Sequence, residues 1–417
     1  MKNSGVAITG LGFIGAVGNS TAKLRQALNH GQDGLGALTL FKSELAGEFP
    51  VGQYRGTLED DFRARRRTLT RRELARLSRS DLLALIAVAE AFTQARLSSR
   101  DVDSPRAGVF LGQSVCGTLS SESYYLDCVA EAARSGKVTP ASLDRLFVHE
   151  GANSCDAIAR EFCLAGPVAS YMTACSSGAN AIGLAAAQIA RGRADVMVAG
   201  GADSLSRIAF IGFGSLQVMS PEGPRPFDAE RKGMCVGEGA GMLVLESAAH
   251  AKKRGATVLA WLAGYGHTCD AHHLTAPHPE GLGAIGAMKM ALADAGLEPG
   301  QIGFVSAHGT GTQDNDKVES LAISRVFGPR AVPVSSTMRF FGHTLAASGG
   351  MKAVISVQAL LDKKLPPNLG LRTALDDSLD LVRETRTASA LKHVISNSFG
   401  FGGNNAALVF SAAEAQP

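Results

Sequence analysis

The sequence repeats one order of predicted elements in its two halves, and this repeat limits the possible folds more than any other feature. In each half, a buried strand ends in closely spaced glycines. An alanine-rich helix, a second buried strand, and then a strand, tight turn and long small-residue helix follow. The segments are Val6–Thr9, Asp81–Ala95, Ala107–Leu111 and Val168–Ala190, then Val258–Ala263, Ala284–Ala295, Ile302–Ala307 and Val332–Leu361. The shared order indicates an internal duplication.

Strands that alternate with helices predict an α/β fold whose parallel sheets are covered by helices on both faces. We expect the halves to meet in the charged turn near Lys252–Ala256, which divides the chain into residues 1–253 and 254–417. An insertion around Ser120–Glu161 makes the first half longer. Because 45% of the residues are hydrophobic and 19% are charged, the chain can bury a large core.

Composition argues against several classes of protein. The seven cysteines form no C-x-x-C pair, which argues against a disulfide scaffold or a common zinc pattern and favours a reducing, cytoplasmic compartment. No apolar run reaches the ~18 residues that span a bilayer, so we expect no membrane segment. We interpret the apolar N-terminal stretch as the first strand, since glycines interrupt it. A net charge of +3 and an aromatic content of 6% predict no nucleic-acid partner.

A literal G-x-G-x-x-G follows the first strand at Gly10, Gly12 and Gly15, as in dinucleotide-binding folds. In that motif the third glycine opens a helix, whereas here a helix is predicted to start only near Ser20 or Thr21. No acidic residue closes a second strand at the expected distance. A nucleotide-dependent dehydrogenase is therefore the weaker interpretation.

Cys175 is a candidate nucleophile because it lies in the predicted turn between a buried strand and a helix of small residues. At a helix N-terminus the dipole and the free N–H groups favour a thiolate. Gly178 and the alanines after it allow the close backbone approach that a sharp nucleophile turn needs. A buried structural cysteine explains the position equally well.

Two histidines strengthen the interpretation of Cys175 as a nucleophile. His308 directly follows a buried strand, and His343 precedes a helix of small residues; each has a neighbouring glycine. A single histidine after a strand is usually a core residue, but two in the same context are harder to explain by packing. The carboxyl ends of strands are also where α/β folds collect their sites.

Ordered motifs along the whole chain resemble those of the β-ketoacyl-acyl carrier protein synthases of the thiolase superfamily, and most of all the elongating type of fatty-acid and type II polyketide systems. The motifs are Ile8–Gly12, Thr173–Gly178, Val198–Asp203, Arg225–Asp228, Gly237–Gly241, Ala307–Thr312, Gly342–His343 and Asn397–Gly403. The resemblance implies a thiolase-like five-layer α/β/α/β/α fold from two duplicated halves. It also implies a dimer, formed either with a second copy or with a related ketosynthase-like subunit.

The resemblance also implies a decarboxylative Claisen condensation of malonyl-acyl carrier protein with an acyl chain held on Cys175. The backbone N–H groups of Cys175 and Phe401 would form the oxyanion hole. Neutral His308 and His343 would donate to the malonyl thioester oxygen, and Phe401 would gate the acyl pocket. Other site residues implied by the family pattern are Thr310, Thr312 and Phe399 at the substrate, and Asp316 and Glu319 in support; for Phe399, core packing is equally plausible. No metal or organic cofactor is implied.

An arginine-rich stretch, residues 63–79, holds eight arginines against Glu73 alone. A charge run is usually a solvated face, but the resemblance implies an acidic carrier protein as partner, docking on this stretch. Arg72 and Arg76 match the docking positions, and we expect them on one face of a helix.

The chain departs from the family pattern at four places. Met338 stands where lysine is expected and Lys352 where glutamate is expected. We predict that Lys352 turns its ammonium toward the site, with Asp316 or Glu319 as partner; alternatively it reaches the surface. A short connection at residues 219–225 and Asn404 in place of threonine favour a specialised polyketide or polyene pathway.

Two alternatives share the fold. A chain-length-factor-like partner subunit would lack the active cysteine, whereas Cys175 is present. A non-elongating acyltransferase or a thiolase would need a different second half: thiolases use a second cysteine there, and Cys235 and Cys269 lie in neither expected motif.

Overall fold

The computed structural model describes residues 5–66, 68–102, 104–137, 146 and 148–415. Its strands form one eleven-stranded sheet in the order β10-β8-β7-β12-β13-β6-β1-β5-β4-β2-β3, and β9 pairs with β11 separately. The strands are β1 Val6–Gly15, β2 Ala107–Gly112, β3 Val168–Tyr171, β4 Val196–Asp203, β5 Gly239–Glu246, β6 Ala260–Cys269, β7 Phe304–Ser306, β8 Pro333–Ser335, β9 Lys364–Leu365, β10 Asp380–Leu381, β11 Arg386–Thr387, β12 His393–Gly400 and β13 Asn404–Ala412. The α-helices are α1 Thr21–His30, α2 Leu58–Arg65, α3 Arg71–Leu74, α4 Arg79–Ala95, α5 Ser99–Val102, α6 Thr118–Ser135, α8 Ala152–Glu161, α9 Ser177–Ala190, α10 Arg207–Ser215, α11 Ala248–Lys253, α12 Leu282–Ala295, α13 Gln313–Phe327, α14 Met338–Phe341 and α15 Ala347–Asp362.

The order of strands confirms the duplication. The first half contributes β3-β2-β4-β5-β1 and the second contributes β8-β7-β12-β13-β6, and the two sets meet where β1 pairs with β6. In both sets the two outer pairs are parallel, while β5 and β13 run antiparallel to their neighbours. The expectation of all-parallel sheets is therefore wrong for β1, β5, β6 and β13. The predicted boundary after residue 253 falls between α11 and β6.

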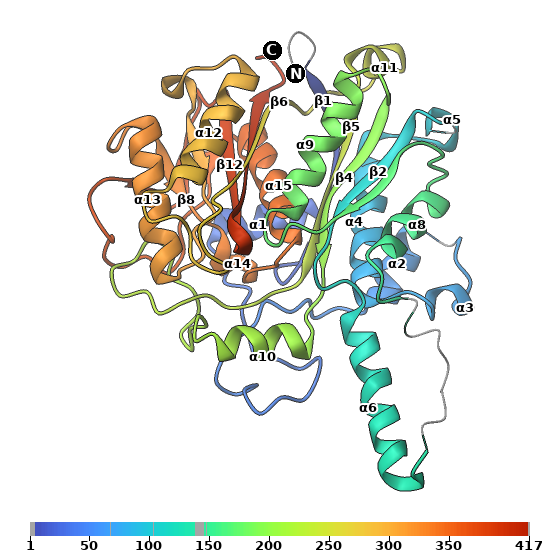
Figure 1. Ribbon diagram of the computed structural model, residues 1–417. Coiled ribbons are helices and arrows are strands. Elements are labelled where there is room, and N and C mark those ends of the chain that lie inside the picture. Colours follow the sequence, from blue (N-terminus) through green and yellow to red (C-terminus); the bar gives the residue numbers. More distant parts are fainter. Residues whose placement is uncertain (1–4, 67, 103, 138–145, 147, 416–417) are drawn as a thin grey trace.

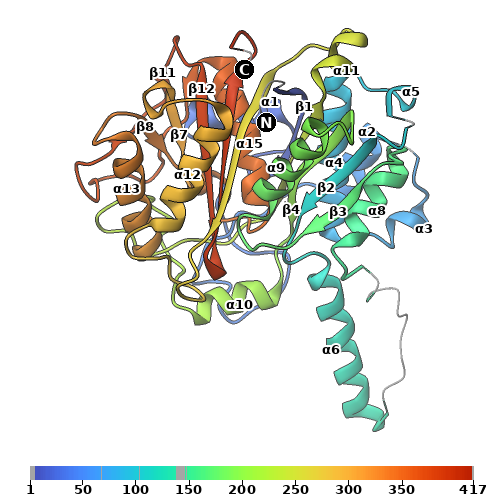
Figure 2. The same cartoon turned by 45° about the horizontal axis from the view of Figure 1, so that its top comes forward.

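Helices separate the two halves of the sheet into layers, which confirms the five-layer α/β/α/β/α fold. The central helices α9 and α15 pack on strands of both halves, α4 packs on β1, β4 and β5, and α12 packs on β6 and β13. In Figure 1 these layers run from α12 and α13 on the left, through α9 and α15, to α4 and α8 on the right. α6 extends away from this body in both views (Figures 1 and 2).

Closely spaced glycines have the same packing role in both halves. A Cβ atom on Gly10 or Gly12 of β1 would collide with the carbonyl oxygen of Ala91 or Ala87 in α4. Gly264 and Gly266 of β6 are restricted in the same way by Ala291 and Ala287 of α12. β1 continues through the glycines to Gly15, and α1 begins at Thr21 with Ser20 as its N-cap. The dinucleotide interpretation is therefore wrong: these glycines let a helix approach a strand and open no phosphate loop.

The core consists mainly of aliphatic residues on the central helices and the strand faces they cover. Within the described ranges, no helix is both long enough and apolar enough to cross a bilayer.

Candidate active site

Cys175 lies in the turn between β3 and α9, two residues before the helix begins. Ala174 has a φ of 51°, in the left-handed region that L-residues rarely adopt, so the turn is sharp. The N–H of Gly178 donates to the carbonyl oxygen of Ala346 at 3.1 Å. A Cβ atom on Gly178 would lie 2.7 Å from that oxygen. This close approach joins the nucleophile turn to the segment that leads into α15.

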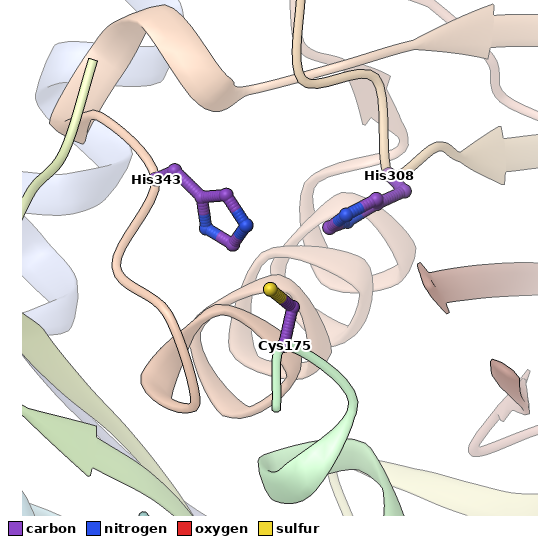
Figure 3. Close-up of side chains that lie close together, drawn as sticks. All are labelled: Cys175, His308 and His343. Carbon is purple, nitrogen blue, oxygen red and sulfur yellow. The ribbon is translucent and has the colours of Figure 1, made fainter. Parts of the chain in front are cut away.

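Two histidines from the second half meet Cys175. His308 follows β7, and His343 follows α14. Their ring centroids are 5.3 Å apart at an interplanar angle of 82°, and ligand-capable atoms of all three side chains lie within 4.8 Å of one another. Figure 3 shows both rings on the side of the turn to which the sulfur points. All three side chains are buried.

Both imidazoles are neutral at physiological pH. Burial, reinforced by the charge of Lys352, lowers the pKa of His343 to about 3. The same two causes, with His343 as a third, hold the pKa of His308 well below its usual range. Nδ1 of His343 accepts the N–H of Leu345 at 3.2 Å, so the proton of the neutral ring is on Nε2. Nδ1 of His308 has no hydrogen-bond partner among the described residues.

The thiol of Cys175 does not have the low pKa that its place before a helix suggested. Burial raises its pKa to about 12, and the carboxylate of Asp203 acts in the same direction. Backbone N–H groups of Phe401 and of Cys175 itself, together with the charge of Lys352, oppose this rise. Desolvation outweighs the helix terminus because the side chain is almost completely enclosed. The two N–H groups expected to form an oxyanion hole both point to the sulfur.

Carboxylates from α13 hold the loop that carries His308. Glu319 accepts the N–H groups of His308 and Gly309 at 2.8 and 2.7 Å. Asp316 accepts the N–H of Gly311 at 3.1 Å and lies 3.7 Å from the guanidinium of Arg231. Both are buried, and burial raises their pKa values, that of Asp316 to about 6. These contacts make both residues supports of the loop.

Asp203, at the end of β4, is a support that the sequence interpretation missed. It accepts N–H groups from Ser114, Val115 and Cys116 and, at 3.0 Å, from Ala346 between His343 and α15. It therefore ties a loop of the first half to the histidine segment of the second. The available signal was an acidic residue at the carboxyl end of a buried strand.

A cavity of about 280 Å³ opens onto the three residues. Of the predicted substrate residues, Thr310, Thr312, Phe399 and Phe401 all line it. The two threonine hydroxyls lie 2.8 Å apart. The ring of Phe401 lies 5.9 Å from that of Phe213 in α10, and Gly402 beside it has a φ of 78°.

Lys352 does not reach the surface. Only 2% of it is exposed, and its Nζ donates to the carbonyl oxygen of Asn397 in β12. Glu319 is the carboxylate that acts on it; Asp316 instead faces Arg231. Met338 is buried as well, at the start of α14.

Some arginines of the arginine-rich stretch make contacts within the fold, and others are exposed to solvent. Arg79 pairs with buried Glu238 at 2.6 Å, and Arg66 stacks 4.4 Å over the ring of Phe162. Arg67 lies outside the described residues. Arg72 and Arg76 are exposed, but the expectation of one shared helix face is wrong. α3 ends at Leu74 because Ser78 caps the next helix, so Arg76 lies in the intervening turn.

The spacing of Cys175, His308 and His343 would also suit three ligands of a metal ion. The buried ammonium of Lys352 acts electrostatically on all three side chains. Such a charge opposes the entry of a divalent cation. This supports the prediction that the site uses no metal.

Comparison with known proteins identifies the family. The model described as "Beta-ketoacyl synthase, N-terminal domain" matches residues 3–251, and "Beta-ketoacyl synthase, C-terminal domain" matches residues 259–372. The chain is 34% identical to a 3-oxoacyl-[acyl-carrier-protein] synthase 2 of Staphylococcus aureus (strain N315), over 99% of this chain and 100% of the relative.

Solved structures of ketosynthases agree with this family assignment. The ishigamide ketosynthase/chain length factor superimposes with a TM-score of 0.91 at 30% identity, covering 98% of this chain and 99% of that one. A type II PKS acyl-carrier protein in complex with its ketosynthase bound to the hexaketide gives a TM-score of 0.87 at 27% identity, covering 99% of this chain and 100% of the other. With both halves matched and its full length covered, the chain belongs to the β-ketoacyl synthase family.

Proposed function

We propose that the protein is an elongating β-ketoacyl-acyl carrier protein synthase, an acyltransferase that condenses malonyl-acyl carrier protein with an acyl chain held on Cys175. The observation that carries this proposal is the meeting of one buried thiol with two neutral imidazoles, His308 and His343, in one cavity. A nucleophile that holds an acyl group and two donors for an enolate oxygen are the groups that this condensation needs.

The first step transfers the acyl chain to the enzyme. The sulfur of Cys175 attacks the thioester carbonyl of acyl-carrier protein, and the pantetheine sulfur leaves and takes up the proton that the thiol gives up. The N–H groups of Cys175 and Phe401 lie where they would stabilise the oxyanion of the tetrahedral intermediate. Because burial raises the pKa of this thiol to about 12, the thiolate must be stabilised by its surroundings during the attack.

The second step forms the carbon–carbon bond. Malonyl thioester loses carbon dioxide, and the electron pair of the broken bond becomes an enolate. His343, with its proton on Nε2, and His308 donate to the enolate oxygen. The enolate carbon then attacks the acyl-cysteine carbonyl, and the Cys175 sulfur leaves to give a β-ketoacyl product. A neutral imidazole suits this role because its one N–H group can donate to the enolate oxygen.

Substrates would arrive on the phosphopantetheine of acyl carrier protein, and no further cofactor is needed for these steps. Thr310 and Thr312 would hydrogen-bond the pantetheine arm, and Phe399 would line the substrate cavity. Phe401 would gate the acyl pocket, since glycine neighbours leave its backbone free to move.

Arg72 and Arg76 would contact the acidic carrier protein. The compartment would be the cytoplasm. The pathway would be a specialised polyketide or polyene pathway, and the chain would form a dimer with itself or with a related subunit. The solved type II PKS ketosynthase supports the polyketide pathway, and the ketosynthase/chain length factor supports a related subunit as partner.

Mass spectrometry after incubation with acyl- and malonyl-carrier protein tests the proposal. We expect an acyl adduct on Cys175 and a β-keto product one two-carbon unit longer. An adduct without elongation would identify a non-elongating acyltransferase, and the absence of any adduct would favour a partner subunit of the chain-length-factor kind.

A further inference from the structure

Lys352 is unusual because it is a lysine buried in the central helix layer of the molecule. It lies in α15 and ranks among the largest fully buried side chains of the described residues. α15 packs against β4, β5 and α9 of the first half and against β12 and β13 of the second. A buried ammonium is costly to desolvate, so it requires compensation by hydrogen bonds and opposite charge.

The surroundings of Lys352 belong to the active site. Its Nζ donates to the carbonyl oxygen of Asn397, and Nδ2 of Asn397 donates to Glu319 at 3.2 Å. Glu319 in turn holds the backbone N–H of His308. One continuous chain of contacts therefore joins the ammonium on α15 to the histidine after β7.

The charge of Lys352 acts on each member of the reactive cluster. It lowers the pKa of the Cys175 thiol and of both imidazoles, while Glu319 and the thiol raise the pKa of Lys352. The ammonium is thus the positive charge that opposes Asp203 at the sulfur and that interacts with Glu319.

We propose that Lys352 is a positioning residue that balances the charge of this cluster: its buried ammonium stabilises the Cys175 thiolate during acyl loading and keeps His308 and His343 neutral. The inference rests on the proposed function for the role of Cys175. With Lys352 charged, the pair of Lys352 and Glu319 is neutral, and ionising the thiol adds one negative charge. Without it, the thiolate would form beside an uncompensated carboxylate.

The pH range of this effect follows from the groups that face the ammonium. They are Cys175 before α9, Glu319 on α13, and His308 and His343 on loops after β7 and α14. Asp203 on β4 acts on the thiol, and Glu319 acts in turn on Asp316. Burial lowers the pKa of Lys352 to about 8. The support of the thiolate is therefore present at neutral pH and is lost as the pH rises through about 8.

The rate at which iodoacetamide alkylates Cys175, followed by mass spectrometry from pH 6 to 10, tests the proposal without any carrier protein. Lys352→Met keeps the length of the side chain and removes its charge. A rise of about one unit in the thiol pKa lowers the thiolate fraction, and with it the alkylation rate at pH 7, about tenfold. Lys352→Arg should retain the parent rate at pH 7 and, because a guanidinium stays charged, should go on supporting the thiolate above pH 8. Met351→Leu, a buried neighbouring change without charge, should retain the parent profile.

Two further variants cover the case in which Lys352→Met does not fold. Met338→Lys combined with Lys352→Met returns a cation from α14, whose preceding Ser336 hydrogen-bonds Gly309 beside His308, and should restore the parent profile. Glu319→Gln removes the carboxylate that raises the pKa of Lys352, so the ammonium is lost at lower pH and alkylation at pH 7 should slow.

Unchanged alkylation in a folded Lys352→Met, slow alkylation in a folded double variant, or faster alkylation in a folded Glu319→Gln would each overturn the proposal. Because alkylation requires no acyl transfer, these outcomes are distinct from a failure to form the acyl adduct or β-keto product.

Discussion

At the scale of single residues, Cys175 differs from the other buried cysteines by its neighbours. Cys155 is also buried, and burial also raises its thiol pKa, to about 12. Its sulfur, however, donates to the carbonyl oxygen of Ala169, whereas the sulfur of Cys175 faces two imidazoles and two backbone N–H groups. Because burial is common to both thiols, we expect the surrounding donors and charges to make Cys175 the more reactive of the two.

We expect Cys175→Ala to abolish condensation while part of the malonyl decarboxylation remains. His308 and His343 act on the malonyl thioester without the thiol, so enolate formation does not require it. Product analysis by mass spectrometry and carbon dioxide release measure the two reactions separately. Cys155→Ala is the matched control and should retain both. Continued chain elongation by Cys175→Ala would show that another group is the nucleophile.

The buried imidazoles also make stability depend on pH. Burial lowers the pKa of His343 to about 3, whereas the unfolded chain has the ordinary value of 6.5. The unfolded state therefore binds more protons between these values, and stability falls as the solution is acidified. His343 contributes stability that is present above pH 6.5 and is reduced by about 2 kcal/mol at pH 5.

Replacing His343 by asparagine should therefore flatten the fall in Tm between pH 7 and pH 5. Thermal unfolding followed by circular dichroism measures this slope. Exposed His30, replaced in the same way, should leave the slope of the parent unchanged. A His343→Asn variant with the same slope as the parent would contradict a neutral, buried His343.

At the scale of elements, the arginine stretch shows how short helices distribute charge. α3 has four residues, and the capping box of Ser78 and Asp81 starts α4 soon after it. Arg79 turns inward to Glu238, while Arg72 and Arg76 remain exposed. A docking surface here would therefore use a turn and a short helix together.

We expect Arg72→Glu with Arg76→Glu to raise KM for carrier-protein substrates about tenfold at low salt, because exposed charges steer an acidic partner. The parent should lose affinity as salt is added, and the variant should respond little. Arg191→Glu with Arg193→Glu makes the same change of charge beyond the far end of α9 from Cys175 and should leave KM unchanged. Steady-state kinetics at several salt concentrations measure KM. Equal KM values for the Arg72/Arg76 variant and the parent would show that the arginine stretch is a solvated surface without a docking role.

At the scale of the whole molecule, the first half has two surfaces that are uncovered in the single chain, the edge strand β3 and the projecting helix α6. β3 is the edge strand of the sheet, and Val168 in it is 42% exposed. α6 projects from the body (Figure 2). The exposed apolar side chains on it are Tyr125, Leu126 and Val129. An unpaired edge strand and a projecting helix with exposed apolar side chains are each typical of an association surface.

We expect Leu126→Lys with Val129→Lys to convert a dimer into monomers, because both side chains would bring charge into an apolar interface. Light scattering coupled to size-exclusion chromatography measures the mass, with the parent examined alone and with a candidate ketosynthase-like subunit. Met290→Lys on α12, at a similarly exposed site in the outer layer, should leave the parent assembly intact. Variants that associate as strongly as the parent would exclude α6 from the interface.

The sequence by itself predicted the duplicated order of the elements and the residues of the candidate site. Periodicity and glycine spacing predicted the duplicated α/β order, and the turn before α9 marked Cys175, because these signals are local. The predicted position of α1 after Ser20 was likewise confirmed.

Only the tertiary structure decided how these residues behave. The antiparallel β5 and β13, the raised pKa of the thiol, Asp203 as a tie between the halves, and Lys352 beside the reactive cluster all depend on segments far apart in the chain. Strand direction follows from the path of connections, and a pKa follows from desolvation and the charges that packing brings near. Neither quantity is contained in a window of neighbouring residues.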